Sequence, residues 1–346
     1  MNTMTATAVK SIKPLGQPWF TSDPFLFCMY HCDRYPAGNG VMGPQASLAG
    51  RNIGQDFTLK DGWRMYHGER VPGFPAHPHR GFETVTVVEQ GLVDHADSMG
   101  AAGRYGNGDT QWLTTGKGVQ HSEMFPLLNS DGDNPLELFQ IWLNLPRAGK
   151  MVAPHFTMFW AEAIPKRVYT NRDGCRVMVE VIAGALDDVR PLAPPPDSWA
   201  VDPNNHVAIW TIRMAPDASW SLPAAVHGIH RTLYFYQGST LTVDGVEVAP
   251  MHGVELHPDR EVVLANGDQE GRVLLLQGRP INEPVAHYGP FVMNTRAELQ
   301  QAFVDYQQNA FGGWPWPAQD QIHPRERRRF ARHADGREET GSDLDN

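Results

Sequence analysis

The sequence contains few cysteines. Its 346 residues include only Cys28, Cys32 and Cys175, and so small and odd a number excludes a disulfide framework as the basis of the fold. Cys28 and Cys32 are four positions apart, which is not the C-x-x-C spacing of common redox and metal motifs. Because their neighbours are typical of a strand, we expect buried thiols here rather than a functional site.

Long apolar runs are also missing. No stretch approaches the length of about 20 residues that a membrane-spanning helix requires. Residues 1–13 lack the apolar core of a signal peptide. The sequence therefore predicts a cytoplasmic protein that has no membrane partner.

Positive charge is in deficit. The formal net charge is −10, whereas nonspecific binding to nucleic acid phosphates requires a basic surface. We therefore expect no direct nucleic acid partner. An interaction with another protein stays open, and the composition does not fix the oligomeric state.

What the chain does contain is enough material for about two domains, given its 346 residues. A hydrophobic content of 41% with 20% charged residues is ordinary for a globular protein with sizeable cores. The 33 glycines and 28 prolines punctuate runs of alternating apolar residues, a texture that indicates short strands and small β-barrels.

Two pairs of metal donors occur in such alternating stretches. His77 and His79 are two positions apart, and Glu83 keeps the same parity. His121 and Glu123 form a second pair with the same spacing. Residues two apart on a strand point to the same face, so both pairs can point into one barrel interior. The pattern predicts a site of three histidines and one carboxylate.

These donor types suit a catalytic metal ion. Neutral imidazole binds iron, copper, zinc and nickel, and a carboxylate adds a charged oxygen ligand. An ion bound in this way keeps coordination positions open for a small ligand. The alternative is that these side chains are polar residues of a barrel wall that pair with one another.

Parity alone does not decide which carboxylate binds. Glu123 is two residues from His121, so both side chains can reach the same inward point. Glu83 lies four residues beyond His79, about 13 Å along an ideal strand, and needs strand curvature to reach the ion. Geometry therefore favours Glu123.

Several motifs carry a family resemblance. They are H-P-H-R-G-F-E-T-V-T from His77, D-S-M-G at residues 97–100, G-D-T-Q-W-L-T-T-G-K-G-V-Q-H-S-E-M ending at Met124, and G-P-F-V-M-N-T at residues 289–295. Through them the chain resembles the pirins, a branch of the bicupin superfamily, over roughly residues 20–310. The resemblance implies an all-β fold of two tandem cupin (jelly-roll) barrels with a C-terminal helix.

The resemblance also implies a cofactor and its ligands. In pirins an iron ion is held by the histidines of H-P-H and by the histidine and glutamate of H-S-E. Here these are His77, His79, His121 and Glu123. Many other cupins take the carboxylate from the first motif instead, which would be Glu83. We expect Fe(II), and the ligand types alone leave another divalent first-row metal open.

The expected organisation has four parts. They are an N-terminal metal-binding barrel (18–165), a C-terminal barrel without a complete metal site (170–290), a helix with a Trp/Pro segment (291–317) and a charged flexible tail (318–346). When a Gln-Gly pair of each half is aligned, Ala224 and Val226 occupy the positions of the H-x-H histidines. The helix should begin at Thr295, with Glu298 completing its cap.

The resemblance to bacterial pirins implies a dioxygenase that cleaves flavonols such as quercetin with O2. Glu123 would then be both a metal ligand and the candidate catalytic base for the flavonol hydroxyl. Other pirins imply an alternative, an iron- or redox-sensitive binding module that regulates a partner protein without turnover. The same four ligands serve both functions.

Overall fold

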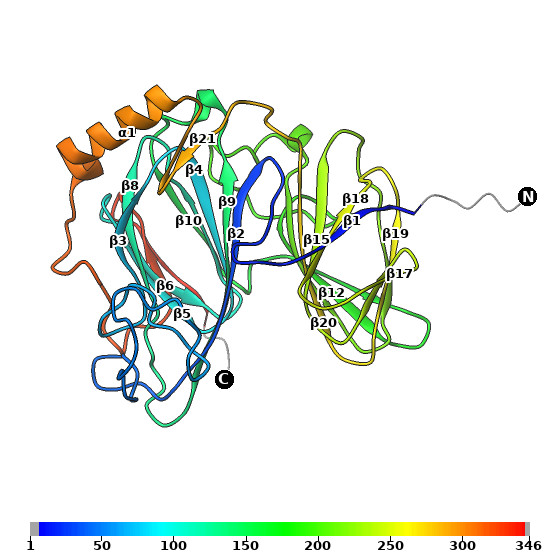
Figure 1. Cartoon of the computed structure of the whole chain (residues 1–346), viewed down its shortest axis with the longest axis horizontal. Coiled ribbons are helices and arrows are strands. Elements are labelled where there is room, and N and C mark those ends of the chain that lie inside the picture. Colours follow the sequence, from blue (N-terminus) through cyan, green and yellow to red (C-terminus); the bar gives the residue numbers. More distant parts are fainter. Residues whose placement is uncertain (1–6, 343–346) are drawn as a thin grey trace, which may run out of the picture. The chain divides into compact units, whose positions relative to one another are not determined.

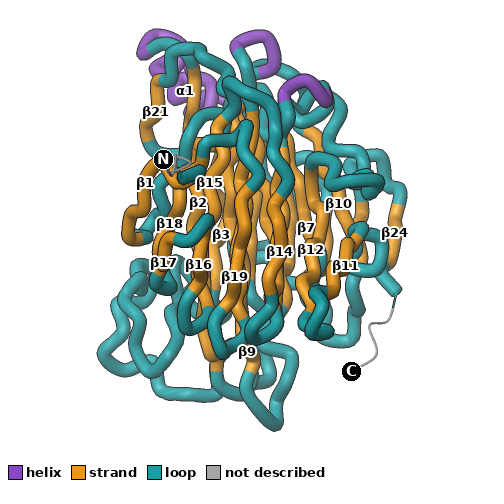
Figure 2. The backbone as a smooth tube through the Cα atoms, turned by 90° about the vertical axis from the view of Figure 1, so that its right-hand side faces the viewer, coloured by secondary structure: helices purple, strands orange, loops and turns teal. Residues whose placement is uncertain are grey.

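The chain folds almost entirely into strands and loops. A computed structural model describes residues 7–342, and helix is confined to α1 and a few short 3-10 turns (Figure 2). The described residues fall into two compact units. We call Met29–Glu162 with Glu283–Asn346 the histidine unit, and Met1–Cys28 with Ala163–Asn282 the apolar unit. Each terminus thus belongs to the unit that is formed mainly by the other half of the chain.

The histidine unit contains two antiparallel sheets. The first has the order β10 (His155–Phe159), β7 (Thr110–Thr114), β4 (Phe82–Gln90), β9 (Asn134–Asn144), β2 (Phe25–Tyr35). The second has the order β24 (Glu338–Thr340), β23 (Phe330–Arg332), β6 (Ala102–Gly106), β5 (Leu92–Asp97), β8 (Val119–Met124), β3 (Gly73–His79). β2 and β3 are edge strands of the two sheets.

Burial explains why the central strands are rich in apolar and β-branched residues. β8 is buried along its whole length and β4 along all but its last two residues. A strand that is covered on both sides is typically rich in β-branched and apolar residues, and the T-V-T-V-V run of β4 supplies them. The polar residues of β8 therefore need partners inside the protein.

A hairpin and a helix complete this unit. Strands β21 (Ala286–Tyr288) and β22 (Phe291–Met293) pair with each other, and α1 (Arg296–Asn309) lies near β21 and β8 in Figure 1. Thr295 caps α1, and its hydroxyl and Glu298 form a reciprocal capping box. The expected helix and its cap are confirmed. The unit also contains the 3-10 turns η1 (Arg147–Gly149) and η3 (Ala310–Gly312).

The C-terminal segment differs from the expected flexible tail. β23 pairs with β6 and extends the six-stranded sheet. The buried guanidinium of Arg104 binds both oxygens of Asp94 and also donates to the backbone carbonyls of His323 and Arg327. A buried guanidinium needs several acceptors, and this segment provides them. The expectation of a flexible tail is therefore wrong for the described part of 318–346; residues 343–346 lie outside it.

The apolar unit has a seven-stranded and a four-stranded sheet. The larger has the order β1 (Val9–Pro14), β18 (His252–Leu256), β15 (His230–Gln237), β20 (Gly271–Gly278), β13 (Ala208–Met214), β12 (Arg176–Ala183), β11 (Lys166–Thr170). The smaller has the order β14 (Ser219–Leu222), β19 (Val262–Asn266), β16 (Leu241–Val243), β17 (Val246–Val248). The 3-10 turn η2 spans Pro203–Asn205.

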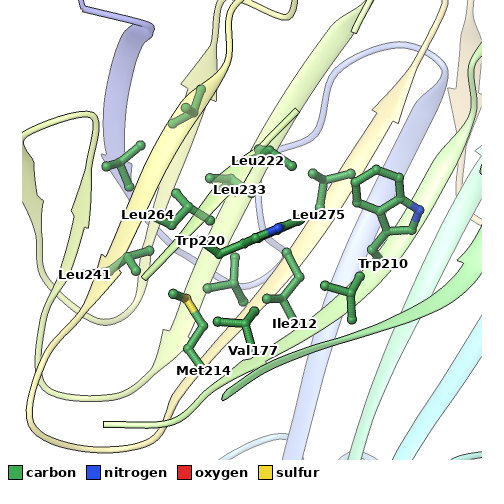
Figure 3. Packing of buried hydrophobic residues seen from close by; sticks show 14 of the residues in the cluster. Val177, Trp210, Ile212, Met214, Trp220, Leu222, Leu233, Leu241, Leu264 and Leu275 are labelled. Atoms are coloured by element: carbon green, nitrogen blue, oxygen red, sulfur yellow. The ribbon is translucent and has the colours of Figure 1, made fainter. Parts of the chain in front are cut away.

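Apolar side chains fill the interior of the apolar unit. Figure 3 shows Trp220 packed among leucines, Ile212 and Met214. Ala224 and Val226 lie in the loop between β14 and β15, outside the strands, and both are exposed. Within residues 7–342, the only cluster of three or more candidate metal donors lies in the histidine unit.

Candidate metal centre

Three histidines meet inside the histidine unit. β3 pairs with β8 in a register that sets His77 opposite His121 and His79 opposite Val119. The ring centroids of the three imidazoles are 4.6 to 4.9 Å apart. One ring nitrogen from each lies within 4.8 Å of the other two. The prediction that the H-x-H pair and His121 point to one interior is confirmed.

The ring nitrogens are arranged as ligands rather than as a hydrogen-bonded cluster. Both nitrogens of His121 and Nδ1 of His79 are buried and have no hydrogen-bond partner. His77 Nδ1 lies 2.9 Å from the Pro75 carbonyl; because a carbonyl can only accept, Nδ1 carries the proton and Nε2 has a free lone pair. Buried polar atoms rarely stay unpaired, so this donor set fits a metal ion.

Burial also keeps these imidazoles neutral. Desolvation lowers the pKa of His77 to about 4, and it lowers the pKa of His79 and His121 well below the ordinary range. Each positive imidazole would disfavour the others further. At neutral pH all three present lone pairs, which is the state that binds a metal.

Glu123 lies beside this cluster. Its Oε2 is 3.8 Å from His121 Nε2, which is not an ion pair because His121 is neutral. Gln140 Nε2 donates to both carboxylate oxygens, at 3.0 and 2.8 Å, and the Thr86 hydroxyl lies 3.1 Å from Oε1. Burial raises the pKa of Glu123. The carboxylate is therefore close to His121 but lies outside the group of donors that are all within 4.8 Å of one another. Gln140 of β9 and Thr86 of β4 fix its orientation.

Glu83 does not share this interior. On β4, Thr86 faces Glu123, so Glu83, three residues away, lies on the opposite face of the sheet. There it is fully buried and accepts a 2.6 Å hydrogen bond from Thr114. The parity argument is wrong for Glu83 because the chain turns at Gly81 (φ 89°) and passes from one sheet to the other.

A second polar pair, which the sequence patterns did not indicate, lies in the same interior. On β5, His95 is opposite Glu123 and Asp97 is opposite His121. His95 Nε2 is 3.1 Å from Asp97 Oδ2, and its ring lies 5.6 Å from that of His121. The H-x-D spacing is the available sequence signal, but nothing in it indicates that β5 lies next to β8.

Two half-buried aromatic residues, Trp142 and Phe74, lie next to the histidines. Trp142 of β9 is half-buried, with its ring 5.4 Å from His79 and 4.2 Å from Phe82. Phe74 of β3 is opposite Glu123, and its ring is 6.3 Å from His77. The carboxylate and histidines are thus bordered by aromatic rings from two different sheets.

These observations define a class of protein. Two antiparallel sheets around a donor cluster, with an H-x-H pair on one strand and an H-x-E pair on its neighbour, are the arrangement of a metal-binding cupin. Family models match the chain twice, as pirin over residues 42–143 and as the pirin C-terminal cupin domain over residues 209–312. The chain belongs to the pirin family. Its fold is therefore two cupin domains with a C-terminal helix, as expected.

Known proteins of the family are similar over most of their length. A Vibrio cholerae protein provisionally named quercetin 2,3-dioxygenase is 37% identical over 242 residues, which cover 70% of this chain and 80% of the relative. Human pirin is 34% identical over 254 residues, covering 72% and 81%. The solved structure of a quercetin 2,3-dioxygenase from Acinetobacter baumannii matches with a TM-score of 0.68 and 26% identity, covering 88% of this chain and 98% of that one.

Membrane-spanning helices are absent from residues 7–342. No helix there combines the length and the apolar character that crossing a bilayer demands.

Proposed function

We propose that this protein is a metal-dependent dioxygenase that cleaves a flavonol such as quercetin. His77, His79, His121 and Glu123 would hold one ion, with Fe(II) as the expected metal. The observation that supports this best is the set of three neutral imidazoles with unpartnered nitrogens beside a buried carboxylate. The names of the similar dioxygenases supply the substrate class.

When bound, the metal would polarise the substrate's oxygen atoms and provide the redox partner for O2. In the overall reaction both oxygen atoms of O2 enter the product, and one ring carbon leaves as carbon monoxide. The protein's own contribution is to hold the substrate in place, to accept the proton of its 3-hydroxyl and to exclude water.

Glu123 is the proposed acceptor of that proton. Burial raises its pKa, which makes the carboxylate a stronger base at neutral pH than an exposed glutamate. Gln140 and Thr86 fix its orientation through hydrogen bonds, so the carboxylate loses little freedom when a substrate arrives.

The half-buried rings of Trp142 and Phe74 fit a flat aromatic substrate. Each ring borders a different ligand, Trp142 at His79 and Phe74 at His77. Aromatic faces bind other aromatic rings through apolar burial and offset stacking. A planar substrate can therefore be held near the donor cluster without a charged contact.

The test is aerobic incubation of Fe(II)-loaded protein with quercetin, in which loss of flavonol absorbance and release of carbon monoxide are followed together. The proposal expects both signals at matched rates, and neither from His121→Ala. Stoichiometric iron binding without turnover would overturn the dioxygenase and favour the alternative, a pirin-type binding module that regulates a partner protein.

A further inference from the structure

A long loop, residues 36–72, lies beside the proposed metal ligands and has no role in the proposed chemistry. Residues 36–72 join the edge strands β2 and β3 without forming a strand or helix of their own. Connections of this length in compact domains commonly form binding loops. Phe57 in this loop is 48% exposed although it is a large apolar residue, and such exposure marks a contact surface.

Ring contacts connect this loop to the donor cluster. Phe57 lies 6.4 Å from Phe74 and 4.9 Å from His67, measured between ring centroids. Phe74 in turn contacts His77 and is opposite Glu123 across β3 and β8. The ring of His31, from β2, makes an edge contact with Phe74 at 5.8 Å. The aromatic side chains therefore form a continuous wall that leads outward from the ligands.

His31 is part of a buried polar chain. Its Nδ1 is 2.8 Å from the Tyr66 hydroxyl, which is 2.6 Å from Oδ2 of Asp33. Asp33 also accepts two hydrogen bonds from Arg64. All four residues are buried. None of them binds the metal in the proposed function.

The chain fixes the tautomer of His31. Asp33 is paired with a guanidinium and can only accept, so the Tyr66 hydroxyl must donate its single proton to Asp33. The Tyr66 oxygen is then an acceptor, and Nδ1 of His31 must be the donor. Burial lowers the pKa of His31 to about 3, so the ring carries no second proton. Nε2 is left with a free lone pair.

That lone pair has no partner in the part of the chain that the structure describes. His31 is 7% exposed, and its only hydrogen bond runs through Nδ1. Nε2 is not among the fully buried unpartnered atoms of the unit, so a molecule that enters from solvent can reach it. His31 therefore presents a fixed, neutral acceptor to a donor from outside the protein.

We propose that His31 Nε2 accepts a hydrogen bond from a phenolic hydroxyl of the substrate while the adjoining substrate ring lies against Phe74. This inference rests on the proposed function and deepens it, since it assigns recognition of a hydroxylated aromatic ring at a distance from the reacting atoms. His31 is separated from His77 by the single ring of Phe74. A three-ring flavonol is long enough to touch both ends of this path.

The experiment compares quercetin with 3-hydroxyflavone, which has the same three-ring skeleton and the reacting 3-hydroxyl but no other hydroxyl group. Dissociation constants are measured by quenching of tryptophan fluorescence in zinc-loaded protein, in which redox-inactive zinc prevents turnover. The variants are His31→Phe, His31→Gln and Tyr66→Phe. The control is His227→Phe, because the side chain of His227 is 91% exposed in the apolar unit.

The measured quantity is the dissociation constant of 3-hydroxyflavone divided by that of quercetin, so that weaker quercetin binding lowers the ratio. His31→Phe should weaken quercetin binding about tenfold relative to 3-hydroxyflavone, because one hydrogen bond to a partly buried group is lost. His31→Gln, which offers an amide oxygen near the position of Nε2, should restore part of the ratio. His227→Phe should leave it unchanged, and zinc content should be equal in all proteins.

Tyr66→Phe separates positioning from packing. It removes the acceptor of the Nδ1 proton, so the nitrogen NMR signal of His31 Nε2 should lose its unprotonated character, and the ratio should fall by a smaller factor. If His31→Phe left the ratio unchanged, either with no loss of binding or with equal weakening of both ligands, the proposed role of His31 would be overturned while the proposed function would stand. If wild-type protein bound neither flavonol, the proposed function and this inference would both fall.

Discussion

Gln140 donates from a single amide nitrogen to both oxygens of the Glu123 carboxylate, at 3.0 and 2.8 Å. The contact joins β9 of one sheet to β8 of the other. It fixes the plane of the carboxylate beside His121 without neutralising its charge. For Glu123 as the proposed ligand, loss of such an orienting contact should lower metal affinity by about 10- to 100-fold.

The first prediction concerns the two glutamates. Glu123→Gln should lower iron content sharply and stop flavonol cleavage, because an amide lacks the charge that helps to hold the ion. Glu83→Gln should retain most of the iron, since Glu83 lies on the opposite face of β4. Iron per folded chain, measured after identical loading, decides between them. Loss of iron from Glu83→Gln with retention in Glu123→Gln would contradict the assignment.

The second prediction concerns stoichiometry. The protein should bind about one metal ion per chain, and His121→Ala should lose it while keeping the fold, because many strands and not one ligand hold the barrel together. Elemental analysis gives the metal content, and circular dichroism reports the fold. A second equivalent that disappears in His257→Ala, or a collapsed spectrum for His121→Ala, would refute this account.

The third prediction concerns pH and the metal-free protein. The pKa of His77 is about 4 when folded, below its ordinary value of 6.5. Between these values the unfolded chain binds a proton that the folded chain does not, so the free energy of unfolding falls as pH falls. The slope should be up to about 1.4 kcal/mol per pH unit for this one group. Above about pH 6.5 the contribution is constant.

Urea unfolding of metal-free protein between pH 7.5 and 5 measures this dependence. His77→Gln should show a shallower fall than wild type, because one such group has been removed. Saturating zinc should raise the stability of wild type at every pH at which the protein is folded, since the ion binds only the folded state. Parallel curves for wild type and His77→Gln would show that His77 titrates normally.

The fourth prediction concerns Arg104. Arg104→Met should lower the free energy of unfolding by about 3 to 5 kcal/mol, because it leaves the buried Asp94 carboxylate without its cation. It should also release the segment around His323, whose carbonyl accepts from Arg104. Limited proteolysis of this segment and urea unfolding report the two effects.

Arg332→Met is the matched control. Arg332 lies on β23 and donates one long hydrogen bond of 3.3 Å to the carbonyl of Gly100. Its loss should cost less than about 1 kcal/mol. Similar losses for Arg104→Met and Arg332→Met would show that the Arg104 contacts are not what anchors the C-terminal segment.

The features that depend on one strand or one helix could be predicted from the sequence. The spacing of two residues places His77 with His79, and His121 with Glu123, on common faces because side chains alternate along a strand. The pairing of Thr295 with Glu298 placed the start of α1, because a capping box is local. Turn-rich apolar alternation indicated small β-barrels.

Long-range packing sets which strands are neighbours and which face a side chain takes once the chain has turned. Strand periodicity cannot be counted through the turn at Gly81, and so Glu83, which shares the parity of His79, lies on a face away from the site. The approach of β5, β9 and β4 brings His95, Gln140 and Thr86 to Glu123. These contacts join residues far apart in the chain, and no local pattern specifies which pairs of strands will meet.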